Sequence, residues 1–174
     1  MSQFQRLMRS LHEEGVRYCM IGVWGANLHA ENAGMVFTTY DRDLFIPRDA
    51  PNLAKAWDAC ERAGLELTCG REELDRPRDL WLAERVVEQR ALTRAHGPDQ
   101  LLIDLTLVMG EFEFEDVWPA RREFVSEGVP VLVASLAHIV ASKAQAGRPK
   151  DALFLETHKE ALRDLLRSEG LRNP

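Results

Sequence analysis

One run of residues constrains the fold of this chain more than any other. At 36–46, a β-branched and aromatic entry leads into Asp41, Arg42 and Asp43, and an apolar exit stops at Pro47. These residue types favour a strand, and the proline marks its end. Because side chains alternate along a strand, Asp41 and Asp43 should face one side and Arg42 the other. The chain must therefore build a sheet in which a charged segment lies on a largely buried strand.

Two carboxylates on one face of a strand create an electrostatic problem. From the rise per residue, Asp41 and Asp43 would lie roughly 6–7 Å apart, where their negative charges repel. A divalent cation between them would remove this repulsion. The alternative is a structural ion cluster, in which one of the two aspartates pairs with an arginine.

Hydrophobic periodicity and turn residues predict helices and strands along the whole chain. Caps such as Asp49 and Ser135 and stops such as Gly64 help to predict helices over 4–14, 23–29, 50–63, 77–86, 136–146 and 149–169. Apolar or alternating runs predict strands over 16–21, 36–46, 65–68, 87–95, 101–108 and 130–133. The predicted fold class is α+β (mixed α/β): a mixed β-sheet flanked by helices, with C-terminal helices that close the domain.

Length and charge limit the domain organisation and the partners. A chain of 174 residues, 45% of them hydrophobic, can bury one core, and we expect a single domain over 1–174 with its core over about 1–133 and a helical segment over about 134–170. The net charge of −6 does not favour a nucleic-acid partner. Arginines between 71 and 94 alternate with acidic residues, which favours a solvated face over a nucleic-acid-binding stripe.

Cysteine usage and hydropathy indicate the compartment. The three cysteines show no CxxC spacing and suit reduced thiols. No apolar run reaches the ~18 residues of a membrane helix, and we expect no signal peptide. The sequence therefore predicts a cytoplasmic protein that does not enter a membrane.

The segment from 22 to 43 resembles the nucleotidyltransferase superfamily with the polymerase-β-like core, in particular its minimal and AbiEii-like bacterial branch. The resemblance covers a turn, a short helix and a Thr-x-Asp-x-Asp strand, with the matching residues Gly22, Ala26, His29, Thr39, Asp41 and Asp43. Two features depart from the pattern, because Val23 stands where Gly or Ser is usual and 30–35 lengthens the spacing. Trp24, beside the turn, is a candidate for base stacking, and His29 is interpreted as a helix-packing or ribose-side residue.

The resemblance implies a carboxylate triad. Asp41 and Asp43 would be joined by Asp104 from a neighbouring strand, and the three would hold Mg²⁺ or Mn²⁺. Asp104 lies within the strongest apolar run of the chain, where an ionised carboxylate is costly unless it is paired. The alternative for Asp104 is an exposed strand face or an ion pair with Arg90 or Arg94.

A second match lies near the C-terminus, where Lys143 begins the string K-x-x-x-G-R-P-K-D. This string is similar to a segment that small nucleotidyltransferases of the AbiEii and related groups carry after the core. It implies that Lys143 acts beside the three aspartates and touches phosphates or the transferring phosphoryl group. The residues implied to bind the nucleotide are Gly22, Val23, Thr39, Arg148 and Lys150. The alternative is a helix end followed by a helix start, with the charges serving as caps.

Three functional hypotheses follow. The resemblance implies a metal-dependent nucleotidyltransferase that moves a nucleoside monophosphate from an NTP such as ATP to a hydroxyl of a small molecule, a protein or an RNA end, with release of pyrophosphate. Val23 and the lengthened spacing motivate the second, a catalytically inactive binding or regulatory protein, for instance of a toxin–antitoxin system, with a protein partner or a second copy of itself. The third is an unrelated α/β protein with a structural ion cluster.

Overall fold

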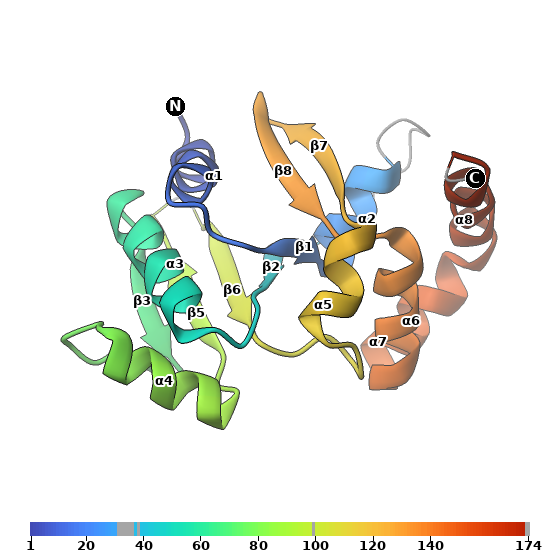
Figure 1. The fold of residues 1–174 in the computed structure, drawn as a ribbon. Coiled ribbons are helices and arrows are strands. Elements are labelled where there is room, and N and C mark those ends of the chain that lie inside the picture. Colours follow the sequence, from blue (N-terminus) through green and yellow to red (C-terminus); the bar gives the residue numbers. More distant parts are fainter. Residues whose placement is uncertain (31–36, 38, 99, 173–174) are drawn as a thin grey trace.

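The structure, a computed structural model, describes residues 1–30, 37, 39–98 and 100–172 (Figure 1). The helices are α1 (Gln3–Glu13), α2 (Gly22–Ala30), α3 (Ala50–Arg62), α4 (Leu80–Gln89), α5 (Phe114–Val117), the 3-10 helix η2 (Trp118–Ala120), α6 (Leu136–Ala146), α7 (Pro149–Thr157) and α8 (Lys159–Arg172). The strands are β1 (Cys19–Ile21), β2 (Asp41–Phe45), β3 (Glu66–Cys69), β4 (Glu72–Glu73), β5 (Thr93–His96), β6 (Leu102–Thr106), β7 (Arg122–Ser126) and β8 (Val129–Val133).

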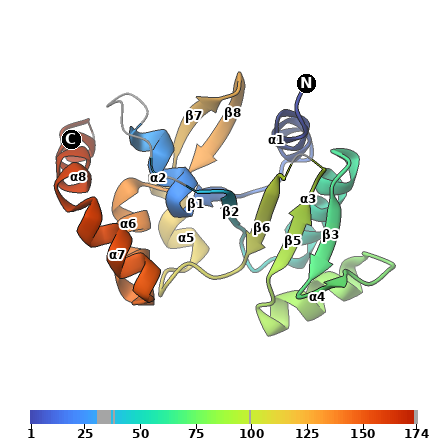
Figure 2. The same cartoon turned by 180° about the vertical axis from the view of Figure 1, so that it is seen from behind.

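All eight of these strands form one mixed sheet in the order β4-β3-β5-β6-β2-β1-β8-β7. The pairs β2–β6 and β1–β8 are parallel, and the other neighbours are antiparallel. Helix α3 lies in front of β3, β5 and β6 in Figure 1 and behind them in Figure 2, so α3 covers one face of this part of the sheet. Helix α1 packs against α3 and β8. The helices α6, α7 and α8 gather at the other end of the molecule. These observations confirm the predicted mixed α+β fold.

Local sequence explains how the first layer forms. Ser2 and Gln5 make a capping box at the start of α1, and the side chain of Asp49 caps α3 just before Pro51. Both helices bury an apolar stripe, which includes the fully buried Trp57. The indole N–H of Trp57 donates to the Thr93 hydroxyl at 3.1 Å, so its polar atom is satisfied inside the core.

Two predicted strands are shorter in the structure. The strand predicted over 36–46 begins only at Asp41 and ends at Phe45, and the predicted positions 36 and 38 lie outside the described residues. The strand predicted over 87–95 was wrong for its first half, because α4 continues to Gln89. That helix ends where Arg90 adopts a left-handed conformation and its N–H donates back to Val86 and Val87. Buried packing of one side of α4 outweighs the weak alternation that favoured a strand.

The single C-terminal helix predicted over 149–169 was also wrong, since it is two helices that meet at His158. The His158 ring packs against Phe154 and Phe37, with centroids 4.9 and 4.5 Å apart, and this aromatic contact accompanies the break. The second helix, α8, continues past the expected end at 170 to Arg172. Its Glu169 carboxylate accepts the backbone N–H groups of Leu136 and Ala137, which caps α6 and fixes α8 to it.

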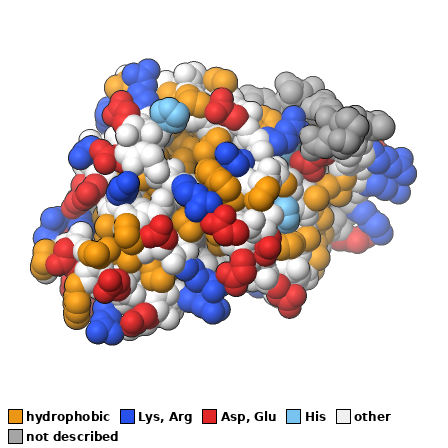
Figure 3. All heavy atoms as spheres, in the orientation of Figure 1, with side chains coloured by type: hydrophobic (Ala, Val, Ile, Leu, Met, Phe, Trp, Pro, Cys, Tyr) orange, Lys and Arg blue, Asp and Glu red, His pale blue; other side chains and the backbone are white. Residues whose placement is uncertain are grey.

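The surface agrees with a mixed charge distribution. On the face drawn in Figure 3, basic and acidic side chains are interspersed rather than separated into two regions.

Cys19 and Cys60 are free thiols in the core, and burial raises the pKa of each to about 12, so both stay protonated. None of the helices described here is both long enough and apolar enough to cross a membrane.

Candidate functional site

The predicted carboxylates lie on adjacent strands. In the parallel pairing of β2 with β6, Asp43 is the register partner of Asp104, and Asp41 is the partner of Leu102. Asp41, Asp43 and Asp104 therefore share one face of the sheet, while Arg42 points to the opposite face against the Phe4 ring of α1. The predicted alternation of the Asp-Arg-Asp segment is confirmed.

These carboxylates face a cavity of about 490 Å³ between the sheet and the helices α6 and α7. All nine residues that were predicted to act in catalysis, nucleotide binding or metal binding lie in its wall: Gly22, Val23, Thr39, Asp41, Asp43, Asp104, Lys143, Arg148 and Lys150. The structure thus brings together residues from four separate segments of the chain. Their catalytic and binding roles stay predictions.

Asp43 is a carboxylate whose ionised form is disfavoured in the cavity. Its pKa is raised to about 6, first because burial removes water from the carboxylate and then because Asp104 and Asp41 repel its negative charge. Lys143 and Lys150 act in the opposite direction but do not compensate.

Gly22 makes room for that carboxylate. Its φ of +68° lies in the left-handed region, and a Cβ built on it would overlap Asp43 Oδ2. The residue is therefore glycine for two reasons, the backbone conformation at the start of α2 and the close approach of a carboxylate. This packing also places Asp43 directly beside the N-terminus of α2.

Asp104 forms the ion pair with Arg94 that was its predicted alternative, and the predicted metal-binding triad stays a prediction. It faces the other two aspartates, and it also forms a bidentate ion pair in which Arg94 Nε donates to Oδ1 at 2.6 Å and Nη2 donates to Oδ2 at 2.9 Å. In the part of the chain that the structure describes, no three His, Cys, Asp or Glu side chains are close enough together to hold a metal ion as they stand. Arg94 supplies the positive charge beside this carboxylate.

The opposite wall of the cavity is organised by a residue to which the sequence assigned no role. Asp151, only 1% exposed in the first turn of α7, accepts from Lys143 Nζ at 3.2 Å and from Arg148 Nε at 2.6 Å. Burial alone would raise the pKa of Asp151, but the hydrogen bond from Arg148 and the charge of Lys143 outweigh it and hold that pKa below its usual range. The last letter of the K-x-x-x-G-R-P-K-D string was the sequence feature that could have identified it.

Replacing Asp151 with Asn should destabilise the protein by about 3 kcal/mol at pH 7, because Lys143, itself 9% exposed, would become a buried cation without a counter-charge. The folded-state pKa of Asp151 is depressed, so its contribution is present above the unfolded pKa near 4 and is lost as the pH falls through the folded value. Urea unfolding of both proteins between pH 3 and 8 measures the difference. The exposed Asp164→Asn of α8 is the control, and an equal loss in both variants would contradict the assigned role.

The predicted Trp24 base-stacking platform is not part of this cavity. Trp24 lies on the other side of β2, where the guanidinium of Arg42 sits 4.3 Å from its ring centroid and 4.1 Å from that of Phe4. His29 is confirmed as a helix-packing residue: its Nε2 lies 2.8 Å from the Ala134 carbonyl and its ring packs edge-on against Phe124. Neither side chain lines the cavity.

The chain is similar to a solved structure of the same type of fold. One such structure is the solution structure of the antibiotic-resistance factor ANT(2'')-Ia, a nucleotidyltransferase, whose reported conformational dynamics are regulated by substrate. The TM-score is 0.51 at 17% sequence identity, and the alignment covers 98% of this chain and 92% of the other. No protein-family model matches the chain, and no curated protein is significantly similar to it in sequence. The likeness confirms a nucleotidyltransferase-like fold; the AbiEii-like branch stays a prediction.

Proposed function

We propose that the chain transfers a nucleoside monophosphate from an NTP to a hydroxyl group and releases pyrophosphate. One observation carries the proposal. Asp43 and Asp104 are register partners on two parallel strands, while the basic side chains of Lys143, Arg148 and Lys150 lie on the opposite wall of the same cavity. A carboxylate cluster opposite Lys143, Arg148 and Lys150 suits a ligand that is polyanionic and carries a cation. A nucleoside triphosphate with a divalent metal is such a ligand.

The chemistry of the three aspartates suits a divalent metal, although the described side chains are not gathered around one as they stand. Asp41, Asp43 and Asp104 offer the oxygen ligands that Mg²⁺ and Mn²⁺ prefer. Burial and, after it, the charges of Asp104 and Asp41 raise the pKa of Asp43, and a cation would offset the second of these causes. When bound, the metal would neutralise triphosphate charge and polarise the α-phosphoryl group. The three aspartates would hold it.

The remaining steps belong to the side chains and backbone of the cavity. Lys143 and Arg148 would bind the triphosphate, and the N-terminus of α2 at Val23 would add backbone donors. The acceptor oxygen attacks the α-phosphorus, a new P–O bond forms, and the bond to the bridging oxygen breaks so that pyrophosphate leaves with the electron pair. The hydroxyl proton would pass to a carboxylate oxygen of Asp104.

The acceptor is best matched by a small molecule or a protein. The mixed surface charge and the net charge of −6 do not favour RNA. The similar structure belongs to an antibiotic-resistance factor, which supports a small organic acceptor with hydroxyl groups. Leu92 and Val108, 43% and 42% exposed in the cavity wall, would contact its apolar parts.

Thermal unfolding with a panel of nucleoside triphosphates tests the proposal. In the presence of Mg²⁺, one triphosphate at a hundred times its dissociation constant should stabilise the wild type by about 2.7 kcal/mol, roughly 5–10 °C for a chain of this size. The double variant Asp41→Asn/Asp43→Asn should not respond.

The exposed pair Asp58→Asn/Asp164→Asn is the matched control and should respond like the wild type. If no triphosphate stabilises the wild type, the alternative of an inactive binding or regulatory protein is favoured. A shift of equal size in the Asp41→Asn/Asp43→Asn variant would mean that the ligand binds elsewhere.

A further inference from the structure

The ion pair between Arg94 and Asp104 occupies the position where the proposed site needs a free carboxylate. Asp43, Asp104 and Arg94 lie in one row across the sheet, because Asp104 is the register partner of Asp43 on β2 and of Arg94 on β5. Both Asp104 oxygens accept from the same guanidinium. Bidentate arginine–carboxylate pairs are among the strongest hydrogen-bonded contacts in proteins.

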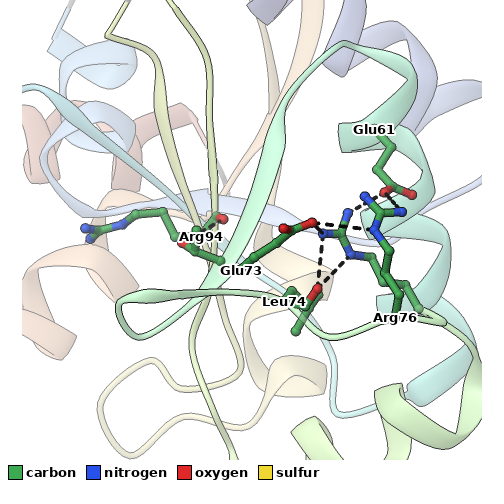
Figure 4. Close-up of polar contacts among 7 residues, drawn as sticks. Glu61, Glu73, Leu74, Arg76 and Arg94 are labelled. Carbon is green, nitrogen blue, oxygen red and sulfur yellow. Dashed lines mark hydrogen bonds and ion pairs between the residues drawn. The ribbon is translucent and has the colours of Figure 1, made fainter.

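Arg94 differs from the other arginines of its region. Arg76 and Arg78 form ion pairs with Glu61 and Glu73. The Arg76 side chain is exposed, as the interpretation of a solvated face expects, whereas that of Arg78 is only 5% exposed. In Figure 4 the Arg94 side chain extends away from this cluster. Its ion pair with Asp104 turns it toward the carboxylates instead.

The two partners are buried to different extents. The Asp104 side chain is 11% exposed and fixed on a central strand, whereas that of Arg94 is 41% exposed. The guanidinium can therefore leave Asp104 without unpacking the core, because much of it already faces water. The carboxylate cannot leave, since its backbone is paired on both sides.

We propose that Arg94 is a built-in competitor of the metal: it neutralises Asp104 in the metal-free protein and must be displaced before that carboxylate can bind a divalent cation. The proposal rests on the proposed function, because it needs the three aspartates to be the metal ligands. This competition explains why Asp43 and Asp104 are register partners on adjacent strands, yet the described side chains do not form a ready metal site. In the metal-free state Arg94 compensates a cluster that would otherwise carry three adjacent negative charges.

Displacement of Arg94 weakens metal binding by the strength of the ion pair that is lost. Hydrogen bonds between charged groups are the stronger class, so removing the competitor should strengthen metal binding about tenfold or more. Lysine at the same position would keep the positive charge but not the bidentate geometry. Arg94→Lys should therefore give a smaller gain than Arg94→Ala.

Titration with Mn²⁺ alone, followed by electron paramagnetic resonance of the free ion and by calorimetry, tests this competition without any activity assay. We expect Arg94→Ala to bind Mn²⁺ at least about tenfold more tightly than the wild type. Arg85→Ala is the matched control, because it also removes one positive charge and Arg85 pairs only with the exposed Glu88 on α4 among the described residues. In an Arg94→Ala/Asp104→Asn double variant the gain should disappear.

The outcomes separate the two proposals. Equal affinities of the wild type, Arg94→Ala and Arg94→Lys would overturn the competition and leave the metal site standing, as would weaker binding by both variants. Absence of Mn²⁺ binding by all proteins would overturn the metal site and the competition together. If Arg94→Ala does not fold, the Arg94→Lys comparison decides, and equal affinity there overturns the proposal.

Discussion

We expect the Asp43→Asn variant to lose the proposed nucleotidyl transfer and, without metal, to be more stable than the wild type above about pH 6. Asp43 is buried beside two other carboxylates, and its pKa is raised to about 6 by that burial and by their charges. Asparagine has nearly the same shape but carries no charge, so it removes the repulsion. It is also a poorer metal ligand, and loss of several kcal/mol of transition-state stabilisation lowers the rate by about a thousandfold or more.

The sign of the pH dependence follows from the direction of the shift. The folded protein keeps the Asp43 proton up to about pH 6, whereas the unfolded chain releases it near pH 4. The wild type therefore loses stability relative to the variant between these two values, and the difference stays constant above them. About two pKa units correspond to about 3 kcal/mol at most. Denaturant unfolding from pH 3.5 to 8, in the presence of a chelator, measures it.

Asp58→Asn is the control for this experiment, because Asp58 lies on the exposed side of α3 and its loss removes the same formal charge. It should shift stability little and without this pH profile. Added Mg²⁺ should reverse the order, since only the wild type can use the cation. If the Asp43→Asn variant is less stable than the wild type at pH 8 without metal, the ionised Asp43 carboxylate does not destabilise the folded protein, and the prediction is wrong.

Gly22→Ala is expected to have the second large effect, a loss of about 3 kcal/mol of stability together with loss of transfer. Any L-residue is unfavourable by about 1–2 kcal/mol at a φ of +68°. The new Cβ would also overlap Asp43 Oδ2, so either the carboxylate or the start of α2 must move. Both lie in the wall of the candidate site. Urea unfolding and ligand-induced thermal shift measure the two losses.

Gly15→Ala separates strain from overlap. Gly15 has a similar φ of +63°, but a Cβ there meets nothing within 4 Å. It should lose only the conformational part, about 1–2 kcal/mol, and should bind nucleotide like the wild type. Equal stability losses at both glycines would show that the Asp43 carboxylate adapts without cost.

Much of the candidate site could be predicted because its residues interrupt local patterns. Asp41 and Asp43 break an apolar strand, and Asp104 breaks the most hydrophobic run of the chain. Charges that disturb hydrophobic periodicity are visible in sequence, since burying them needs a reason. The segment from Lys143 to Asp151 was visible for another reason, its resemblance to a family motif.

Errors arose where local propensity and tertiary packing compete. The residues at 87–89 are compatible with a strand or a helix, and packing of α4 selected the helix. Helical periodicity at 149–169 is continuous in sequence, but the contact of His158 with Phe37 accompanies a division into two helices. Trp24 was a candidate for base stacking because it lies beside Gly22 in sequence, yet a helix turns neighbouring side chains to different faces.

The sequence by itself determined the order of most elements and the mixed fold, because these depend on hydrophobic periodicity and turn residues. It also marked Asp41, Asp43 and Asp104 as charges in apolar runs, whereas the other candidate residues of the cavity came from the resemblance to a family. Only the tertiary structure decided how the charges pair. Arg94 meets Asp104 through the register of β5 with β6, and Asp151 holds Lys143 and Arg148 through the turn between α6 and α7. Ion pairing acts over a few ångströms and depends on register and side-chain direction, which no local pattern in the chain specifies.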